Sequence, residues 1–263
     1  MPQGFVELIQ KTAWPMDRQP LFGSFHITCL AIGFAAAIIL AFLLRKTNER
    51  QNRRLFLVVG IALGLSEVYK QLFWYYGIGY VDYPFVIFPF HLCSMPLYIC
   101  LLLGFVRGEK IRQALYDFLA SYCFIGGLIS VTVDAGLLRP YWVMTIHGMA
   151  WHFVLVFLGL YLGFSRRVGR RKGGFIRAAV LYLGLCAVAF CINLAFMEFS
   201  KGTIDMFFVG PGKMNVVVYK DIGEALGRPA VTAIYIATIS LASWVAYKLL
   251  SRRSRRKPTA KSG

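Results

Sequence analysis

The sequence predicts an all-α protein that crosses a membrane seven times, with its N-terminus outside and its C-terminus in the cytoplasm. Three observations predict this fold. The chain of 263 residues is 58% hydrophobic and its mean hydropathy is +0.60, whereas soluble domains are about 45–50% apolar. Seven apolar runs are long enough for a helix to span the hydrocarbon core, which takes about 20 residues. Basic residues gather in alternate loops between these runs.

The apolar runs predict helices because backbone N–H and C=O groups cannot remain unpaired in lipid. The predicted spans are Ser24–Leu44, Leu55–Tyr76, Pro84–Val106, Gln113–Val133, Tyr141–Phe164, Gly174–Glu198 and Arg228–Leu250. They divide the chain into an extracytoplasmic segment (residues 1–23), a transmembrane domain (24–250) and a basic cytoplasmic tail (251–263). The longest outer loop, Phe199–Gly227, is either a lid over the outer mouth of the bundle or a plain surface loop.

The distribution of Lys and Arg sets the predicted orientation. One side of the seven-span arrangement carries 21 of these residues and the other carries 7, and the richer side faces the cytoplasm. The net charge of +17 would suggest a nucleic-acid partner for a soluble protein. Here the basic residues flank apolar spans, so we predict contacts with anionic headgroups at the cytoplasmic face of a bacterial cell membrane and no nucleic acid. The sequence leaves the oligomeric state open.

Ionisable side chains inside a span are costly, so each is a candidate for function. At 1.5 Å per residue, His91 and Cys93 lie roughly 10–14 Å below the outer start of the third span. Several other polar residues fall at similar depths, which predicts a polar cavity open to the outer half of the membrane. The set comprises His26, Glu67, Lys70, His91, Cys93, His147 and Asn193. Asp117, near the cytoplasmic end, and His152, about 140° around the helix from His147, are set aside.

Each of these residues also has a structural interpretation. Glu67 and Lys70 are three residues apart and neutralise one another if they pair. Asn193 fits a hydrogen bond between helices, and His26 fits an interfacial position. A thiol such as Cys93 is inert when buried, unless an imidazole such as His147 accepts its proton and makes it a nucleophile.

Several motifs resemble one family of membrane proteins. The run FPFHLCSMPL (Phe88–Leu97) is similar to the LPLHLC signature of the YwaF-like bacterial membrane proteins, which group with the eukaryotic transmembrane protein 164 lipid acyltransferases. Further matches follow in order along the chain: FGSFHITCLAIGF (Phe22–Phe34) with His26 at the family's histidine, the dipeptide His147–Gly148, Asn193, TIDMFF (Thr203–Phe208) and LGRP (Leu226–Pro229). The family's aromatic run near the C-terminus is missing here, because Arg228 and Pro229 stand in its place.

The resemblance implies acyl transfer between glycerophospholipids, with Cys93 as nucleophile and His147 as base. Water in place of the acceptor lipid would make the reaction that of a lipase. We expect Asn193 to donate to the oxyanion, Lys70 to hold a headgroup phosphate, and His91 to orient a neighbour or the headgroup. No metal or other cofactor is expected for this reaction. The alternative is a non-enzymatic binder or transporter of haem, a metal or a small solute that uses the same histidines.

Overall fold

The computed structural model describes residues 3–79, 85–214 and 216–255, and it confirms the predicted all-α class. Within these ranges the only β contact is an isolated bridge between Pro15 and Tyr141. The helices are α1 (Gln3–Gln10), α2 (Ser24–Leu43), α3 (Glu49–Leu72), α4 (Met95–Phe105), α5 (Glu109–Phe118), α6 (Phe124–Val133), α7 (Trp142–Phe164), α8 (Gly174–Ala195), α9 (Tyr219–Leu226) and α10 (Arg228–Arg255).

Six helical stretches in the described residues are long and apolar enough to cross a membrane. They are Ser24–Lys46, Glu49–Gly77, Glu109–Val133, Trp142–Phe164, Gly174–Ala195 and Arg228–Arg252. These stretches match six of the seven predicted spans. The fourth span is continuous because a π-helical turn, Leu119–Cys123, joins α5 to α6. The last helix runs on to Arg255, and residues 256–263 of the predicted tail lie outside the described residues.

The third predicted span, Pro84–Val106, differs from its prediction. Its apolar helix covers only Leu92–Phe105, a separate 3₁₀ turn covers Phe85–Ile87, and Phe88–His91 between them is not helical. The first residue of the predicted span lies outside the described residues. Pro89 explains the break, because it has no N–H to donate and disfavours helical geometry at Phe88. The prediction of a continuous helix through His91 was therefore wrong, and the depth predicted for His91 and Cys93 had been counted along that helix.

The non-helical stretch before α4 is stabilised by side chains from neighbouring elements. The Ile87 carbonyl accepts hydrogen bonds from Lys70 Nζ (3.1 Å) and Gln71 Nε2 (2.9 Å). The Pro89 carbonyl accepts one from the Tyr98 hydroxyl (2.7 Å). Irregular backbone at membrane depth is tolerated only when protein or water satisfies its polar groups. These bonds therefore explain how the chain can break a helix at this level.

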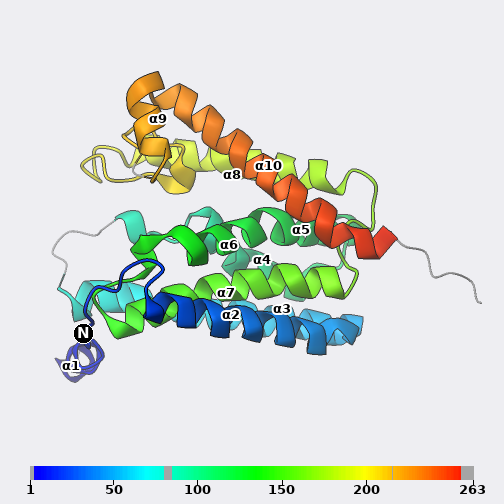
Figure 1. Cartoon of the computed structure of the whole chain (residues 1–263), viewed down its shortest axis with the longest axis horizontal. Coiled ribbons are helices and arrows are strands. Elements are labelled where there is room, and N and C mark those ends of the chain that lie inside the picture. Colours follow the sequence, from blue (N-terminus) through cyan, green and yellow to red (C-terminus); the bar gives the residue numbers. More distant parts are fainter. Residues whose placement is uncertain (1–2, 80–84, 215, 256–263) are drawn as a thin grey trace, which may run out of the picture.

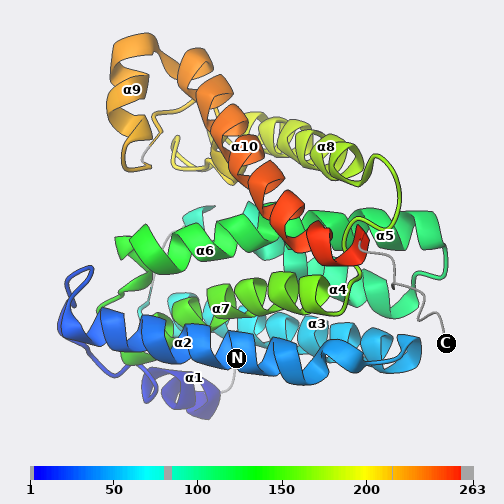
Figure 2. The same ribbon diagram turned by 45° about the vertical axis from the view of Figure 1, so that its right-hand side comes forward.

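The helices pack side by side along the long axis of the molecule (Figure 1). Helix α2 packs on α7, α3 on α4, α6 on α7, and α5 on α8. Helices α8, α9 and α10 form a layer of their own in both views, and α10 crosses it to end beside α5 (Figure 2). The N-terminal α1 and the C-terminal end of α10 lie at opposite ends of the bundle (Figure 1).

A polar network holds α3, α5 and α7 together at the end where α10 finishes. The fully buried Asn52 donates to the Tyr116 hydroxyl (2.6 Å) and accepts from the Tyr161 hydroxyl (2.7 Å). Asp117 is also fully buried, and its Oδ1 accepts from Gln113 (2.9 Å) and from the Gly169 backbone N–H (2.8 Å). Asp117 thus anchors the loop between α7 and α8.

Candidate functional site

Cys93 lies at the start of the short helix in the middle of the bundle. It belongs to a 3₁₀ turn, Leu92–Ser94, that leads directly into α4. The first hydrogen bond of this turn runs from the Ser94 N–H to the His91 carbonyl (2.9 Å), so the N–H groups of Leu92 and Cys93 have no acceptor inside the helix that they open. The positive end of a helix dipole therefore lies at the thiol.

His147 is joined to Cys93 through Trp151, one turn further along α7. The Trp151 indole N–H donates a 2.8 Å hydrogen bond to the Cys93 carbonyl. The His147 ring stacks on the same indole, with centroids 5.6 Å apart and an interplanar angle of 28°. His147 Nε2 is buried and has no hydrogen-bond partner among the described residues. The ring thus has one nitrogen available to exchange a proton.

Lys70 supplies a positive charge on the side of α3 that faces this region. Its ammonium acts electrostatically on both the Cys93 thiol and the His147 ring. The same ammonium forms a 2.8 Å ion pair with Glu67, and Gln71 donates to Glu67 Oε1 (2.7 Å). Glu67 and Lys70 therefore neutralise one another, and Lys70 also donates to the Ile87 carbonyl.

The outer loop between α8 and α9 folds back over His91. The His91 ring contacts the Phe208 ring at a centroid distance of 5.7 Å, and the Phe90 ring contacts that of Phe207 at 5.8 Å. Both Phe207 (φ 54°) and Phe208 (φ 55°) have left-handed backbone geometry, which is strained for bulky residues. Of the two predicted forms of this loop, the buried residues Ile204, Met206, Phe207 and Val209 favour a lid.

Two polar clamps hold this loop in place. Asn193 is fully buried; its Nδ2 donates to the Met206 carbonyl (3.1 Å) and its Oδ1 accepts from the Met206 N–H (2.7 Å). Asp205 accepts from Arg228 Nη2 (2.8 and 3.0 Å) and from the Gly210 N–H (2.7 Å). Burial raises the pKa of the Asp205 carboxyl, while the Gly210 N–H and the Arg228 guanidinium oppose the rise.

His26 lies apart from Cys93, between α2 and α6. Its Nδ1 accepts from the Phe22 N–H (3.0 Å), which leaves Nε2 to donate to the Val131 carbonyl (2.8 Å). Both ring nitrogens are therefore occupied by backbone groups. Among the described residues no three His, Cys, Asp or Glu side chains come together as a group able to hold a metal ion.

Trp151 thus contacts both the Cys93 carbonyl and the His147 ring, Lys70 is paired with Glu67 and the Ile87 carbonyl, and His91 lies under the outer loop. The structure gives His26 and Asn193 backbone partners elsewhere. Trp151, Gln71 and the ion pair between Asp205 and Arg228 were not among the residues predicted from the sequence. Of these, only Trp151 could have been predicted from the sequence. It follows His147 by four residues, and residues four apart on a helix share a face.

The fold and this arrangement define a class of protein: a polytopic helical membrane protein with a cysteine at the start of a broken helix and a histidine on a neighbouring span. The profile of the TMEM164 family matches residues 21–249. The chain belongs to the TMEM164 family. Neither the curated proteins nor the solved structures contain a match to it.

Proposed function

We propose that this protein is a thiol-dependent phospholipid acyltransferase, with Cys93 as nucleophile and His147 as general base. One observation carries the proposal. Cys93 opens a helix inside the bundle and is joined through Trp151 to a histidine whose Nε2 is buried without a partner. The positive helix end offsets part of the cost of a thiolate in apolar surroundings, and an imidazole nearby can accept the thiol proton.

The reaction has two acyl-transfer steps that balance without a cofactor. His147 takes the thiol proton, and the Cys93 sulfur attacks the ester carbonyl of a phospholipid. The ester C–O bond breaks, the acyl group stays on sulfur as a thioester, and His147 returns the proton to the departing lysolipid oxygen. A lysolipid hydroxyl then gives its proton to His147 and attacks the thioester, which restores the thiol. Water in place of the lysolipid yields a free fatty acid.

The oxyanion in this proposal is stabilised by backbone rather than by Asn193. Both ends of the Asn193 amide are bonded to Met206, so this side chain is already occupied. The N–H groups of Leu92 and Cys93 have no acceptor within their helix, and free N–H groups at a helix start are suitable donors to a developing negative charge. Lys70, bonded to Glu67 and Ile87, contributes its charge to the site rather than a headgroup contact.

The test is the covalent intermediate itself. Purified protein incubated with phospholipid that carries a labelled acyl chain should acquire label that hydroxylamine removes. The variant Cys93→Ala should acquire none. Cys29→Ala is the matched control, because Cys29 is also a half-buried cysteine in the membrane domain and its loss should leave the label unchanged. Label that persists in Cys93→Ala would refute the proposal.

One observation favours a second candidate, a binder or transporter of a small anionic solute. Transporters place their substrates at the ends of broken helices, and the structure contains such a break at Phe88–His91, which the sequence analysis had not found. Thermal stabilisation of Cys93→Ala by small carboxylates, with no labelled adduct in the unmodified protein, would favour this function. A haem ligand role for His26 has no support, since both ring nitrogens are bonded to backbone.

A further inference from the structure

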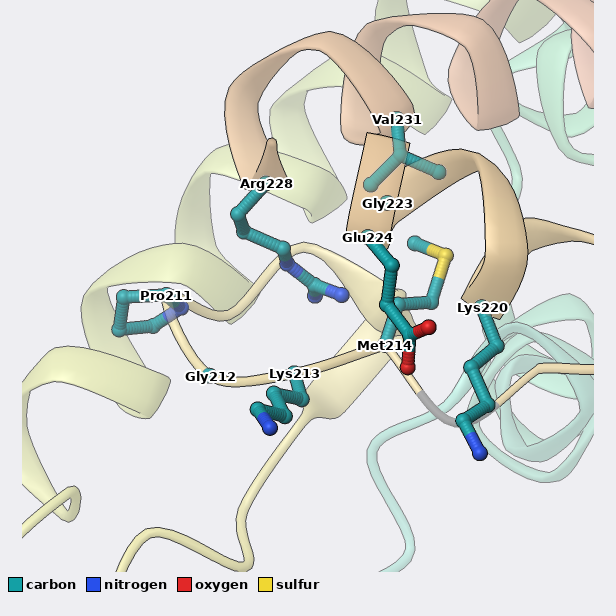
Figure 3. A pocket seen from close by; sticks show the side chains of 9 residues that line it. All are labelled: Pro211, Gly212, Lys213, Met214, Lys220, Gly223, Glu224, Arg228 and Val231. Atoms are coloured by element: carbon teal, nitrogen blue, oxygen red, sulfur yellow. The ribbon is translucent and has the colours of Figure 1, made fainter. Parts of the chain in front are cut away.

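A pocket with several charged side chains in its lining lies where α10 begins. Its volume is about 210 Å³, and the loop after Gly210, helix α9 and the first turn of α10 enclose it. Its lining includes three basic residues, Lys213, Lys220 and Arg228, and one acidic residue, Glu224 (Figure 3). Neither lysine forms an ion pair with any residue that the structure describes.

Arg228 gives this pocket an unused donor. Its Nε donates to the Gly210 carbonyl (2.6 Å) and its Nη2 to Asp205, but its Nη1 is buried without a partner among the described residues. A buried donor left without an acceptor is costly. The side chain of Met214 also lines this pocket, and because it is unbranched and flexible it can move to admit a ligand without moving the backbone.

We propose that this pocket binds a phosphate group, as carried by the headgroup of an anionic phospholipid. Arginine suits this ligand because its planar fork matches phosphate oxygens, and lysine adds point charges. The N-terminal end of α10, a helix of 28 residues, adds a favourable dipole. Arg228 also begins the last span, so the pocket lies at the boundary where lipid phosphates are found.

Exposed apolar side chains beside the pocket favour a lipid over a free anion. Val217 and Val218 directly precede α9, Leu226 ends it, and their side chains are 82%, 64% and 61% exposed. Apolar groups next to a phosphate site provide contacts for the acyl chains of the same ligand. The pocket does not depend on Cys93 chemistry, so its ligand binds whether or not the protein transfers acyl groups.

The experiment uses the full-length Cys93→Ala protein, so that no turnover occurs and the result is independent of the proposed reaction. Native mass spectrometry in detergent measures retention of phosphatidylglycerol against diacylglycerol with the same acyl chains. The pocket variant is Lys213→Gln with Lys220→Gln. The control, Lys11→Gln with Arg18→Gln, removes the same number of charges from the exposed N-terminal segment outside the pocket.

We expect phosphatidylglycerol to be retained over diacylglycerol, and its affinity to fall about tenfold in the pocket variant but not in the control. Competition by millimolar inorganic phosphate would identify the phosphate group alone as sufficient. Retention without competition would show that the acyl chains are needed as well, and both results support the proposal. Equal retention of the two lipids, or equal losses in the pocket and control variants, would overturn it.

Discussion

The Trp151 indole N–H donates to the Cys93 carbonyl at 2.8 Å, and this bond fixes the start of the broken helix against α7. The same indole supports the His147 ring. One side chain therefore sets the position of the proposed nucleophile and, through stacking, that of the proposed base. Residues that hold reacting groups in place affect rate through geometry rather than through chemistry.

Replacing Trp151 by Phe should separate these two roles. The aromatic ring remains for stacking on His147, but the hydrogen bond to the Cys93 carbonyl is lost. We expect a loss of about 1 kcal/mol in stability and adduct formation about tenfold slower, without abolition. Trp142→Phe is the control, since Trp142 is 41% exposed and contacts the Phe25 ring, an interaction that Phe preserves. Equal rates in the two variants would show that the Cys93 bond does not position the thiol.

His147→Gln should slow formation of the labelled adduct about 10²–10⁴-fold, the range expected when a general base is removed. The fold should remain, because Nε2 has no protein partner to lose and the Gln amide can replace the hydrogen bond that the ring makes with the Ser66 backbone. The control is His152→Gln, a histidine on the same helix whose Nδ1 is bonded to the Gly148 carbonyl (2.7 Å). Single-turnover labelling together with the melting temperature measures both effects. A His147→Gln protein that labels at the normal rate would remove this residue from the mechanism.

Asp205→Asn should loosen the outer loop. The change removes the negative charge that faces Arg228 at 2.8 Å, in a pair whose side chains are only 15% and 19% exposed. We expect a loss of about 1–3 kcal/mol and faster proteolysis of the segment between α8 and α9. Asp221→Asn is the comparison, because Asp221 is exposed on α9. If the two variants are cleaved equally fast, the ion pair does not hold the loop.

The orientation predicted from the basic loops can be measured with reporter fusions. A reporter that works only in the cytoplasm should be active when it is joined after Gly263. A reporter that works only outside the cytoplasm should be active when it is inserted at Gly202, an exposed glycine in the loop between α8 and α9. The reason is the excess of Lys and Arg on one side of the spans. Activity of an extracytoplasmic reporter after Gly263 would contradict the orientation.

Where a span is straight, its sequence predicted it closely. The predicted run Tyr141–Phe164 became α7 (Trp142–Phe164), and Gly174–Glu198 became α8 (Gly174–Ala195). The prediction of a continuous helix for the third span was wrong because an apolar run indicates only that a segment is buried in lipid or protein. It does not report whether Lys70, Gln71 and Tyr98 can satisfy a broken backbone.

Some features of the candidate site could be predicted from the sequence, and others depended on the tertiary structure. Residue types and family motifs in the sequence were enough to single out Cys93 and His147 as candidates, because an imidazole inside a membrane is rare and costly and Cys93 lies in the run that resembles the family signature. Only the tertiary structure decided that Trp151 joins them, that Asn193 is occupied by Met206, and that His26 is occupied by backbone. Sequence spacing fixes neighbours along one helix. Contacts between helices depend on packing across the whole bundle, and this packing brought Trp151 against both Cys93 and His147 and the outer loop against His91.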